Sequence, residues 1–576
     1  MSQKAPPPVQ GTFPSCVYGP TQPPLRTWTI GDVLQRQARE YPYHEALICG
    51  NTSTRITYSQ LDDRTRRLGD ALIASGIGPG DRIGIFAGNV AEYVEIVLAT
   101  ARIGGIAVLF NTFFSTEEIE RALRFTGCAF LFICDSLGKR SLRPCIIHLQ
   151  HIMQMQSDDL PEFRQTILLS DNDLGFSNLQ TYEAFLGGSV QFSRDKNETV
   201  EDQVTKNTVC IFQFTSGTTG VPKTVMLTHF NVINNGFLIG DRIGLTSDDT
   251  ICCPWPLFHS SGLVVGLMTS LLYGSTLVLP SPTFDPGETA RALVSEKCTG
   301  LQGVPTMFAA VLAWYHQQGA QLPALRTGII GGSPVSPSLL KTLHESFGLR
   351  DLGIAYGMTE TSPLSYLSKG LQSDERHTWM DILPHTSAKV VDTHGKTVPV
   401  GTPGELCIAG YLLQQGYYQN LEKTREVMRL HDNDGLVWMH TGDEAIMNEK
   451  GQCRISGRIK DIIIRGGENI YPTEIEDRLN DHPAISMSAV VGIKDRRYGE
   501  IVAAFLQLHH GRKAPTTTEI SEWVQLVLGK QKAPALIFYL GVDNVPDEFP
   551  KTASGKIKKA DLVAIGNRLV HNKNKL

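Results

Sequence analysis

The sequence predicts an α/β fold, with a large N-terminal domain of βα-layered sheets and a smaller α+β domain at the C-terminal end. Apolar segments with helical spacing alternate with short β-branched runs over much of the chain, which is typical of helix-covered sheets. The chain has 576 residues, whereas single hydrophobic cores stop growing at about 250 to 300 residues. At least two domains are therefore expected.

The first elements expected are helices over Ile30 to Glu40 and Tyr58 to Ser75, with strands at Arg82 to Phe86 and Ile106 to Leu109. The alternation of apolar helices and β-branched strands continues beyond them. Residues 387–410, "SAKVVDTHGKTVPVGTPGELCIAG", have little helical periodicity and many turn residues. They predict a small β-rich subdomain within the large domain.

The predicted domain boundaries follow changes in composition. Residues 1–28 are an extended proline-rich lead, residues 29–457 the large domain, and residues 458–576 the smaller, mobile domain. Within this last part we expect a helix over Pro472 to Asp481 and a strand at Ala489 to Ile493.

Composition excludes several functional classes. A net charge of -5 gives no electrostatic reason to expect a nucleic-acid partner, because such binding usually requires a basic surface. Eleven scattered cysteines, without a CxxC pair, predict neither a disulfide framework nor a zinc ribbon. Cys145, His148 and His151 have the spacing of metal ligands but no evident fourth ligand, and we interpret them as a fortuitous cluster. The apolar stretch Gly262 to Val278 is shorter than the roughly 20 residues that span a bilayer, so no transmembrane helix is expected.

The two termini bear on localisation. The N-terminus lacks the apolar segment of a signal peptide. The sequence ends in Asn574-Lys575-Leu576, one residue away from the S-K-L signal that the peroxisomal import receptor binds. The alternative is an ordinary basic tail, so the predicted location is the peroxisome or the cytoplasm.

A polar loop between two apolar runs predicts a phosphate site. Gly217 to Thr224 misses the Walker A pattern because Pro222 stands where the second glycine should be, with no N–H to donate. The following residues 224–228 are strand-like, so the loop should join two strands. We expect a clamp on a polyphosphate, made of hydroxyl groups, close backbone approach and one cation. Its members are Thr215, Ser216, Gly217, Thr218, Thr219, Gly220 and Lys223.

The motif "TSGTTGVPK" resembles the signature of the adenylate-forming superfamily, which includes acyl-CoA synthetases and peptide-synthetase adenylation domains. Four further motifs follow in that family's order: "YGMTE", "HTGD", "GRIKDIIIRGGENIYPTEIE" and "PKTASGKI". The form "RGGENIYPTEIE" is most similar to medium-chain acyl-CoA synthetases. Thr224 departs from the family, which usually has glycine after the P-K, and this change should stiffen the clamp.

The resemblance implies an acid–thiol ligase that uses ATP, Mg²⁺, a carboxylic acid and coenzyme A. It implies that Thr359 contacts the phosphates, Glu360 binds Mg²⁺, and Lys556 is the catalytic bridge between the carboxylate and the α-phosphate. Lys460 would be the hinge about which the small domain turns between the two half-reactions.

The resemblance also implies positions for the rest of the substrates. Tyr356 and Gly357 would lie at the adenine, and Asp443 and Arg458 at the ribose. The strip Gly331, Gly332, Ser333 and Pro334 would run beside the adenine and the acyl group. His259, Gly331 and Ala355 would line the acyl pocket, and Gly466 and Gly467 the path of the pantetheine arm.

Two alternatives to a coenzyme A ligase remain open from the sequence. One is a stand-alone ligase that loads a carrier protein, and the other is a catalytically silent nucleotide-binding regulator. The presence of Lys556, Glu360 and Asp443 disfavours the regulator. His259 stands where amino-acid-activating domains carry an aspartate, which argues against an amino acid as substrate. The sequence does not rank a fatty acid against a specialised acid.

Overall fold

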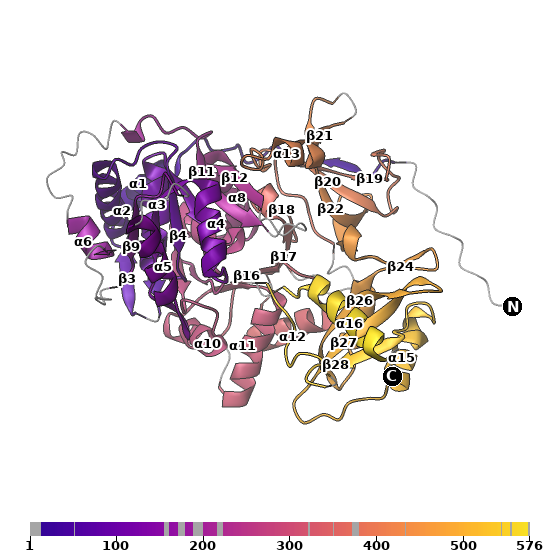
Figure 1. The fold of residues 1–576 in the computed structure, drawn as a ribbon. Helices are drawn as coiled ribbons and strands as arrows, with labels where there is room; N and C mark the ends of the chain where they lie inside the picture. The colour runs from indigo at the N-terminus through magenta and orange to yellow at the C-terminus, as the bar shows by residue number, and fades with distance from the viewer. Residues whose placement is uncertain are drawn as a thin grey trace.

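The computed structural model describes residues 13–573, except 51, 155–159, 171–178, 188–199, 216–222, 321–322, 350, 371–378, 432–433, 543 and 553–555. The described residues form two large sheets covered by helices, a β-rich subdomain and a C-terminal α+β unit (Figure 1). The predicted α/β architecture is confirmed.

The first large sheet contains seven strands and ends at the phosphate loop. β12 is antiparallel to its neighbour β11, and the other pairs are parallel. Its strands are rich in buried aliphatic and aromatic residues, as expected of a sheet with both faces covered. In spatial order they are β10 (Gln180–Thr181), β9 (Gln165–Leu168), β6 (Cys128–Ile133), β4 (Arg82–Phe86), β5 (Ile106–Leu109), β11 (Val209–Thr215) and β12 (Lys223–Thr228).

The second large sheet contains eight strands and carries the predicted adenine strip. β16 and β17 are parallel neighbours, so their carboxyl ends meet at one edge, where ligands bind in open α/β sheets. In spatial order the strands are β18 (Leu364–Leu367), β17 (Asp351–Gly357), β16 (Thr327–Gly331), β15 (Gly300–Gly303), β13 (Thr250–Cys252), β14 (Thr276–Leu279), β2 (Glu45–Cys49) and β3 (Thr54–Thr57).

Helices cover these sheets, and several begin at side-chain caps. Thr29, Thr57, Ser115 and Thr228 each form a capping box. Every residue of α3 except Glu92 is buried. The helices are α1 (Ile30–Glu40), α2 (Tyr58–Ala74), α3 (Ala91–Arg102), α4 (Thr116–Thr126), α5 (Arg143–Gln154), α6 (Tyr182–Gly187), α8 (His229–Arg242), the π-helix η1 (Ser261–Met268), α9 (Thr269–Tyr273), α10 (Pro286–Ser295), α11 (Pro305–Gln318) and α12 (Pro337–Phe347).

The β-rich subdomain forms where short strands were expected. β19 (Thr386–Val391) and β20 (Gly404–Gly410) account for the predicted stretch. One strand was not predicted: part of the proline-rich lead forms β1 and pairs with β19, with Val17 opposite Ala388. The other elements here are β1 (Cys16–Tyr18), α13 (Leu421–Val427), β21 (Met428–Leu430), β22 (Val437–Met447) and β23 (Cys453–Arg458).

The C-terminal unit has its own five-stranded sheet and two buried clusters of its own residues. It lies below the β-rich subdomain in the view of Figure 1. The expected helix ends one residue earlier than predicted, and the expected strand is part of the longer β26. The elements are η4 (Ile459–Asp461), β24 (Ile463–Arg465), β25 (Glu468–Ile470), α14 (Pro472–Asn480), β26 (Ile485–Asp495), β27 (Gly499–Leu508), α15 (Thr517–Leu528), β28 (Leu536–Tyr539) and α16 (Lys559–Lys573).

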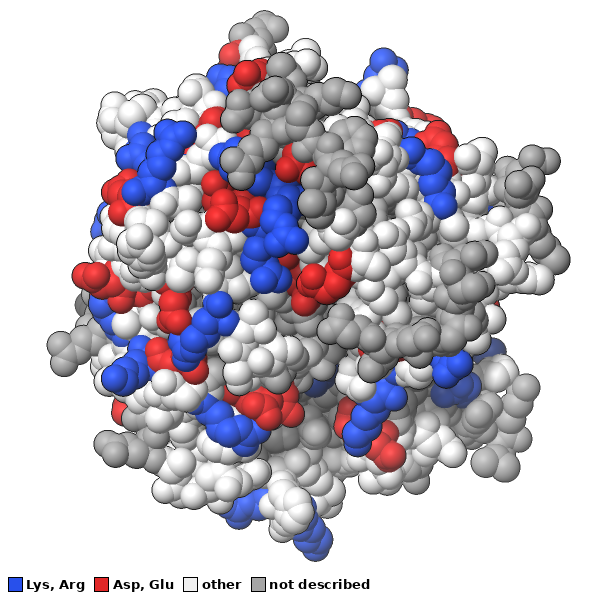
Figure 2. Space-filling view, turned by 90° about the vertical axis from the view of Figure 1, so that its left-hand side faces the viewer, with Lys and Arg blue, Asp and Glu red and all other residues white. Residues whose placement is uncertain are grey.

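Two surface features complete the fold. On the face in Figure 2, acidic and basic side chains are interspersed. A small hairpin, β7 (Ser136–Leu137) and β8 (Arg140–Ser141), precedes α5.

Across the described ranges, no helix is both long and apolar enough for a membrane span.

Candidate active site

The predicted phosphate loop connects two antiparallel strands. Thr215 ends β11 and lies opposite Lys223, which begins β12. The strand–loop–strand prediction is therefore confirmed, and a Walker A loop, which leads into a helix, is excluded. Five predicted clamp residues lie outside the described residues: Ser216, Gly217, Thr218, Thr219 and Gly220.

Lys223 is held close to an aromatic ring at this strand end. Its Nζ lies 5.1 Å from the centroid of the Tyr417 ring, within the range of a cation–π contact. Burial lowers the pKa of Lys223 and Lys423 lowers it further, while Glu360 opposes the shift. The cation is thus placed next to the acidic residue predicted to bind Mg²⁺.

The motif "YGMTE" forms the end of β17 and a tight turn. A Cβ at Gly357 would lie 1.9 Å from the carbonyl oxygen of Pro363, so only glycine fits there. Thr359 and Glu360 follow in the short 3₁₀ helix η2 (Thr359–Thr361), and both are buried. The buried Glu360 carboxylate accepts a hydrogen bond of 2.8 Å from the Tyr417 hydroxyl.

Tyr356, Asp443 and Arg458 form a connected group. The Tyr356 hydroxyl donates to Oδ2 of Asp443 at 2.7 Å, and Arg458 Nε lies 3.2 Å from Oδ1. Asp443 and Arg458 are directly opposite each other on β22 and β23. Burial raises the pKa of Asp443, although Arg458 and Tyr356 counteract this effect. The two residues predicted at the ribose and the one predicted at the adenine are thus adjacent.

The turn that presents Asp443 is braced by a carboxylate that the sequence did not indicate. Glu405 accepts from the backbone N–H of Gly442 at 3.0 Å and pairs with Nδ1 of His440 at 2.7 Å. The His440 ring also contacts His431, with 3.0 Å between their Nε2 atoms. Glu405 is on the neighbouring strand β20, and no local sequence pattern predicts a pairing across strands.

The predicted adenine strip begins at the end of β16. A Cβ at Gly331 would lie 2.6 Å from the carbonyl oxygen of Ala355, so close strand packing already requires this glycine. Its small size is therefore not in itself a sign of an acyl pocket. Gly332 has a φ of +84°, and a Cβ built there would lie 3.4 Å from Cγ1 of Val304 and 3.5 Å from Cε of Lys556. The half-buried Ser333 and the exposed Pro334 follow.

His259 lies just before the π-helix and stays neutral. Its Nδ1 accepts from the backbone N–H of Ser261 at 3.3 Å, which places the ring proton on Nε2. Burial and the nearby Lys556 charge lower the pKa of His259 to about 3. A π-helix is rare and often marks a functional position.

Lys556 extends from the C-terminal unit into this group of residues. Burial lowers its pKa and so does Arg458, while the Asp443 and Glu360 carboxylates act in the opposite direction. Its charge also acts on His259. Residues predicted for ribose binding, metal binding and the acyl pocket are therefore electrostatically coupled to the ammonium group of the predicted catalytic residue.

The residues predicted for coenzyme A lie apart from this group. Gly466 and Gly467 form the turn between β24 and β25, with φ values of +61° and +88°. No atom lies within 4 Å of a Cβ built at Gly467, and the nearest atom at Gly466 belongs to Tyr498 of the same unit. Lys460 is exposed in η4, between β23 and β24.

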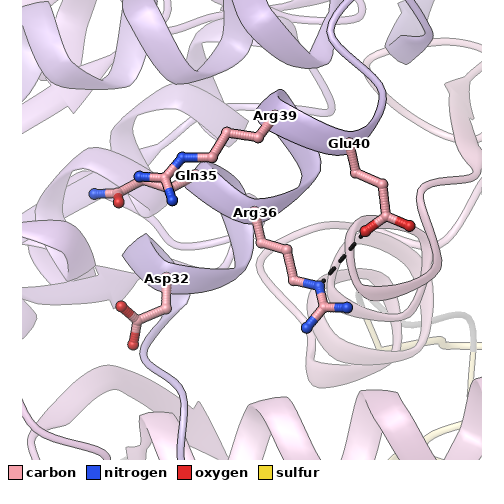
Figure 3. A pocket seen from close by; sticks show the side chains of 5 residues that line it. All are labelled: Asp32, Gln35, Arg36, Arg39 and Glu40. Carbon is pink, nitrogen blue, oxygen red and sulfur yellow. Dashed lines mark ion pairs between the residues drawn. The ribbon is translucent and has the colours of Figure 1, made fainter.

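Other candidate sites carry no comparable chemistry. A hollow of about 430 Å³ on α1 is lined by Asp32, Gln35, Arg36, Arg39 and Glu40, with Arg36 paired to Glu40 (Figure 3). Cys145 is buried in the core, and His148 faces Glu120. No cluster of three or more potential metal ligands occurs in the part of the chain that the structure describes.

The chain belongs to the family of AMP-binding enzymes. The family model for the AMP-binding enzyme matches residues 34–418, and the model for its C-terminal domain matches residues 474–556.

Among its relatives, the chain is 44% identical to the acyl-CoA ligase SID4 of Ajellomyces capsulatus over 564 residues, covering 96% of this chain and 94% of that protein. It is 36% identical to the mitochondrial medium-chain acyl-CoA ligase ACSF2 of Danio rerio, covering 97% and 91%. The anthranilate CoA ligase AuaEII, solved with anthranoyl-AMP, shares the fold with a TM-score of 0.82 at 23% identity, covering 95% of this chain and 98% of that chain.

Proposed function

We propose that the protein is an ATP-dependent, AMP-forming acyl-CoA ligase. In the first half-reaction, a carboxylate oxygen of the acid attacks the α-phosphorus of ATP, which gives acyl-AMP and pyrophosphate. In the second, the thiol of coenzyme A attacks the acyl carbon, so that a thioester forms and AMP leaves. The similarity to SID4 and ACSF2, which are both acyl-CoA ligases, supports this assignment.

The observation that carries the proposal is the position of Lys556. A Cβ built at Gly332 would lie 3.5 Å from Cε of Lys556, and the charges of Asp443, Arg458 and Glu360 act on its ammonium group. Bringing a carboxylate to a triphosphate requires positive charge at the point of attack, and such charge is most effective when water is partly excluded. We assign Lys556 this role, with Lys223 and Thr359 at the phosphates, Tyr356 at the adenine, and Asp443 and Arg458 at the ribose.

Magnesium fits the donor set at Glu360. Mg²⁺ prefers oxygen ligands and is usually bound by one or two carboxylates together with substrate phosphates. Glu360 offers a buried carboxylate with one oxygen oriented by Tyr417, close to the cation Lys223. The ion would neutralise phosphate charge, and the chain's own residues would fix the carboxylate that holds it.

The second half-reaction is proposed to follow a rotation of the residues beyond Lys460. Such a rotation would replace Lys556 by the Gly466–Gly467 turn, whose open backbone leaves room for a pantetheine arm. The substrate is proposed to be a medium-chain fatty acid or a specialised secondary-metabolite acid; the similarity to the medium-chain acyl-CoA ligase ACSF2 supports the first of these. We retain the peroxisome or the cytoplasm as its location; Asn574-Lys575-Leu576 lies outside the described residues.

An assay of pyrophosphate release with ATP, Mg²⁺ and a panel of carboxylic acids, with and without coenzyme A, tests the function. We expect release with some acids and a thioester when coenzyme A is present. Release without any thioester would support a carrier-protein ligase instead, and no release with any acid would support a silent regulator.

A further inference from the structure

Tyr417 lies between the two charged groups that the proposed function places at the phosphates. Its hydroxyl donates to Oε1 of Glu360 at 2.8 Å, and its ring faces the ammonium of Lys223 at 5.1 Å. The side chain is almost completely buried, with 4% of its surface exposed. One residue thus contacts both the carboxylate and the cation.

The backbone around Tyr417 is fixed from several directions. It forms a β-bridge with Val225 of β12, and its N–H donates to the Thr424 hydroxyl at 2.9 Å. Nearby, the N–H of Gln414 donates to the carbonyl oxygen of Glu360 at 2.9 Å. The tyrosine is therefore attached both to the strand after the phosphate loop and to the turn that carries Glu360.

We propose that Tyr417 is a positioning residue, which sets the Glu360 carboxylate for the metal–ATP complex through its hydroxyl and Lys223 through its ring. The inference rests on the proposed function, because it concerns the binding of Mg²⁺ and ATP at that site. A buried carboxylate that keeps a hydrogen-bond donor is held in one orientation. An aromatic face attracts a partly desolvated ammonium group without neutralising it.

Tyr417 is absent from the residues predicted from the sequence. An aromatic residue after a glycine is typical of core packing, and its two charged partners lie 57 and 194 residues before it in the chain. The contacts of Tyr417 with Glu360 and Lys223 form only through the packing of its segment against β12 and η2.

Two variants separate the roles of the hydroxyl and the ring. Tyr417→Phe keeps the ring beside Lys223 and the backbone contacts but removes the donor to Glu360. Tyr417→Leu removes both the aromatic ring and the hydroxyl donor. Tyr418→Phe is the matched control, because the neighbouring Tyr418 packs on Phe212, with 4.6 Å between ring centroids, and its hydroxyl accepts from Nε2 of Gln419 at 3.1 Å.

Isothermal titration calorimetry with ATP, in EDTA and in Mg²⁺, gives a readout that does not depend on turnover. We expect Tyr417→Phe to bind ATP like the wild type in EDTA and to lose roughly tenfold or more of the affinity gained with Mg²⁺, the size expected for a lost hydrogen bond to a charged group. Tyr417→Leu should also bind ATP about two- to fivefold more weakly in EDTA.

Unchanged Mg²⁺ dependence in Tyr417→Phe would overturn the inference and leave the proposed function intact. Equal weakening by Tyr418→Phe would also overturn it, since the effect would then come from general repacking. A wild-type protein that does not bind ATP under any condition would overturn the proposed function and this inference together.

Discussion

The hydroxyl of Tyr356 lies 2.7 Å from Oδ2 of Asp443, so the residue assigned to the adenine is bonded to the one assigned to the ribose. Arg458 holds the other carboxylate oxygen of Asp443. The carboxylate is thus oriented before any nucleotide enters, although burial raises the pKa of Asp443. Preorganisation of this kind reduces the cost of ordering side chains upon binding.

Replacing Tyr356 with phenylalanine should weaken nucleotide binding while preserving the ring. The buried Asp443 loses a donor, and a hydrogen bond to a charged group contributes about 1.5 to 3 kcal/mol. We expect the KM for ATP to rise by roughly tenfold or more, with little change in the KM for the acid. Tyr366→Phe is the control, because Tyr366 of β18 lies opposite Tyr356 and its hydroxyl accepts a hydrogen bond from the Cys453 thiol. An equal rise in both variants would contradict the assignment.

Lys556→Ala should abolish most adenylation and spare thioester formation. Removing one charged donor from a preorganised site costs about 3 to 4 kcal/mol in the barrier, or roughly 10²- to 10³-fold in kcat. Pyrophosphate release measures the first half-reaction, and coenzyme A with supplied acyl-AMP measures the second. Lys558→Ala, two residues further along and exposed, should retain both. Equal loss of both half-reactions in Lys556→Ala would refute the role.

Lys460→Pro should produce the opposite pattern. Proline fixes φ near -65°, which would hinder the backbone rotation proposed for this position. Adenylation should persist in the orientation seen here, whereas thioester formation from supplied acyl-AMP should fall. Lys460→Ala tests whether the charge or the backbone matters and should keep both half-reactions. A proline variant with normal thioester formation would place the hinge elsewhere.

The sequence predicts the fold class well because its signals are local. Helix caps such as Thr29 and Thr57, and the strand-like run after Pro222, depend on neighbours within a few residues. The sequence likewise identifies the candidate site residues that belong to the family motifs, because each motif is a short continuous pattern.

The supporting residues could not be predicted from the sequence, since their partners are distant in the chain. Glu405 braces Gly442 from another strand, and Tyr417 reaches Glu360 and Lys223 through tertiary packing. The resemblance places Gly331 in the acyl pocket, but the close approach of the Ala355 carbonyl already requires a glycine at this position. Whether a glycine is required by packing or lines a pocket depends on which atoms lie opposite it in the fold.

The buried His229 and the half-buried His259 should make the fold sensitive to acid. Burial lowers the pKa of His259 to about 3 and that of His229 to about 4, from an unperturbed value near 6.5. Between the folded-state pKa of each histidine and the unperturbed value near 6.5, the unfolded chain binds more protons than the folded one. The free energy of unfolding therefore falls as the pH decreases below about 6.5. Each histidine contributes at most about 1.4 kcal/mol per pH unit in that window.

Thermal unfolding between pH 7.5 and 5 measures this effect. His229→Gln should show a smaller decrease in Tm over that range than the wild type, because the glutamine has no proton to gain in the unfolded state. His316→Gln, at an exposed position, should behave like the wild type. Activity should show no separate inflection from His259 between pH 5 and 8, since that ring stays neutral there. A His229→Gln variant with the same acid-induced loss of Tm as the wild type would show that the burial of this imidazole does not govern the pH dependence.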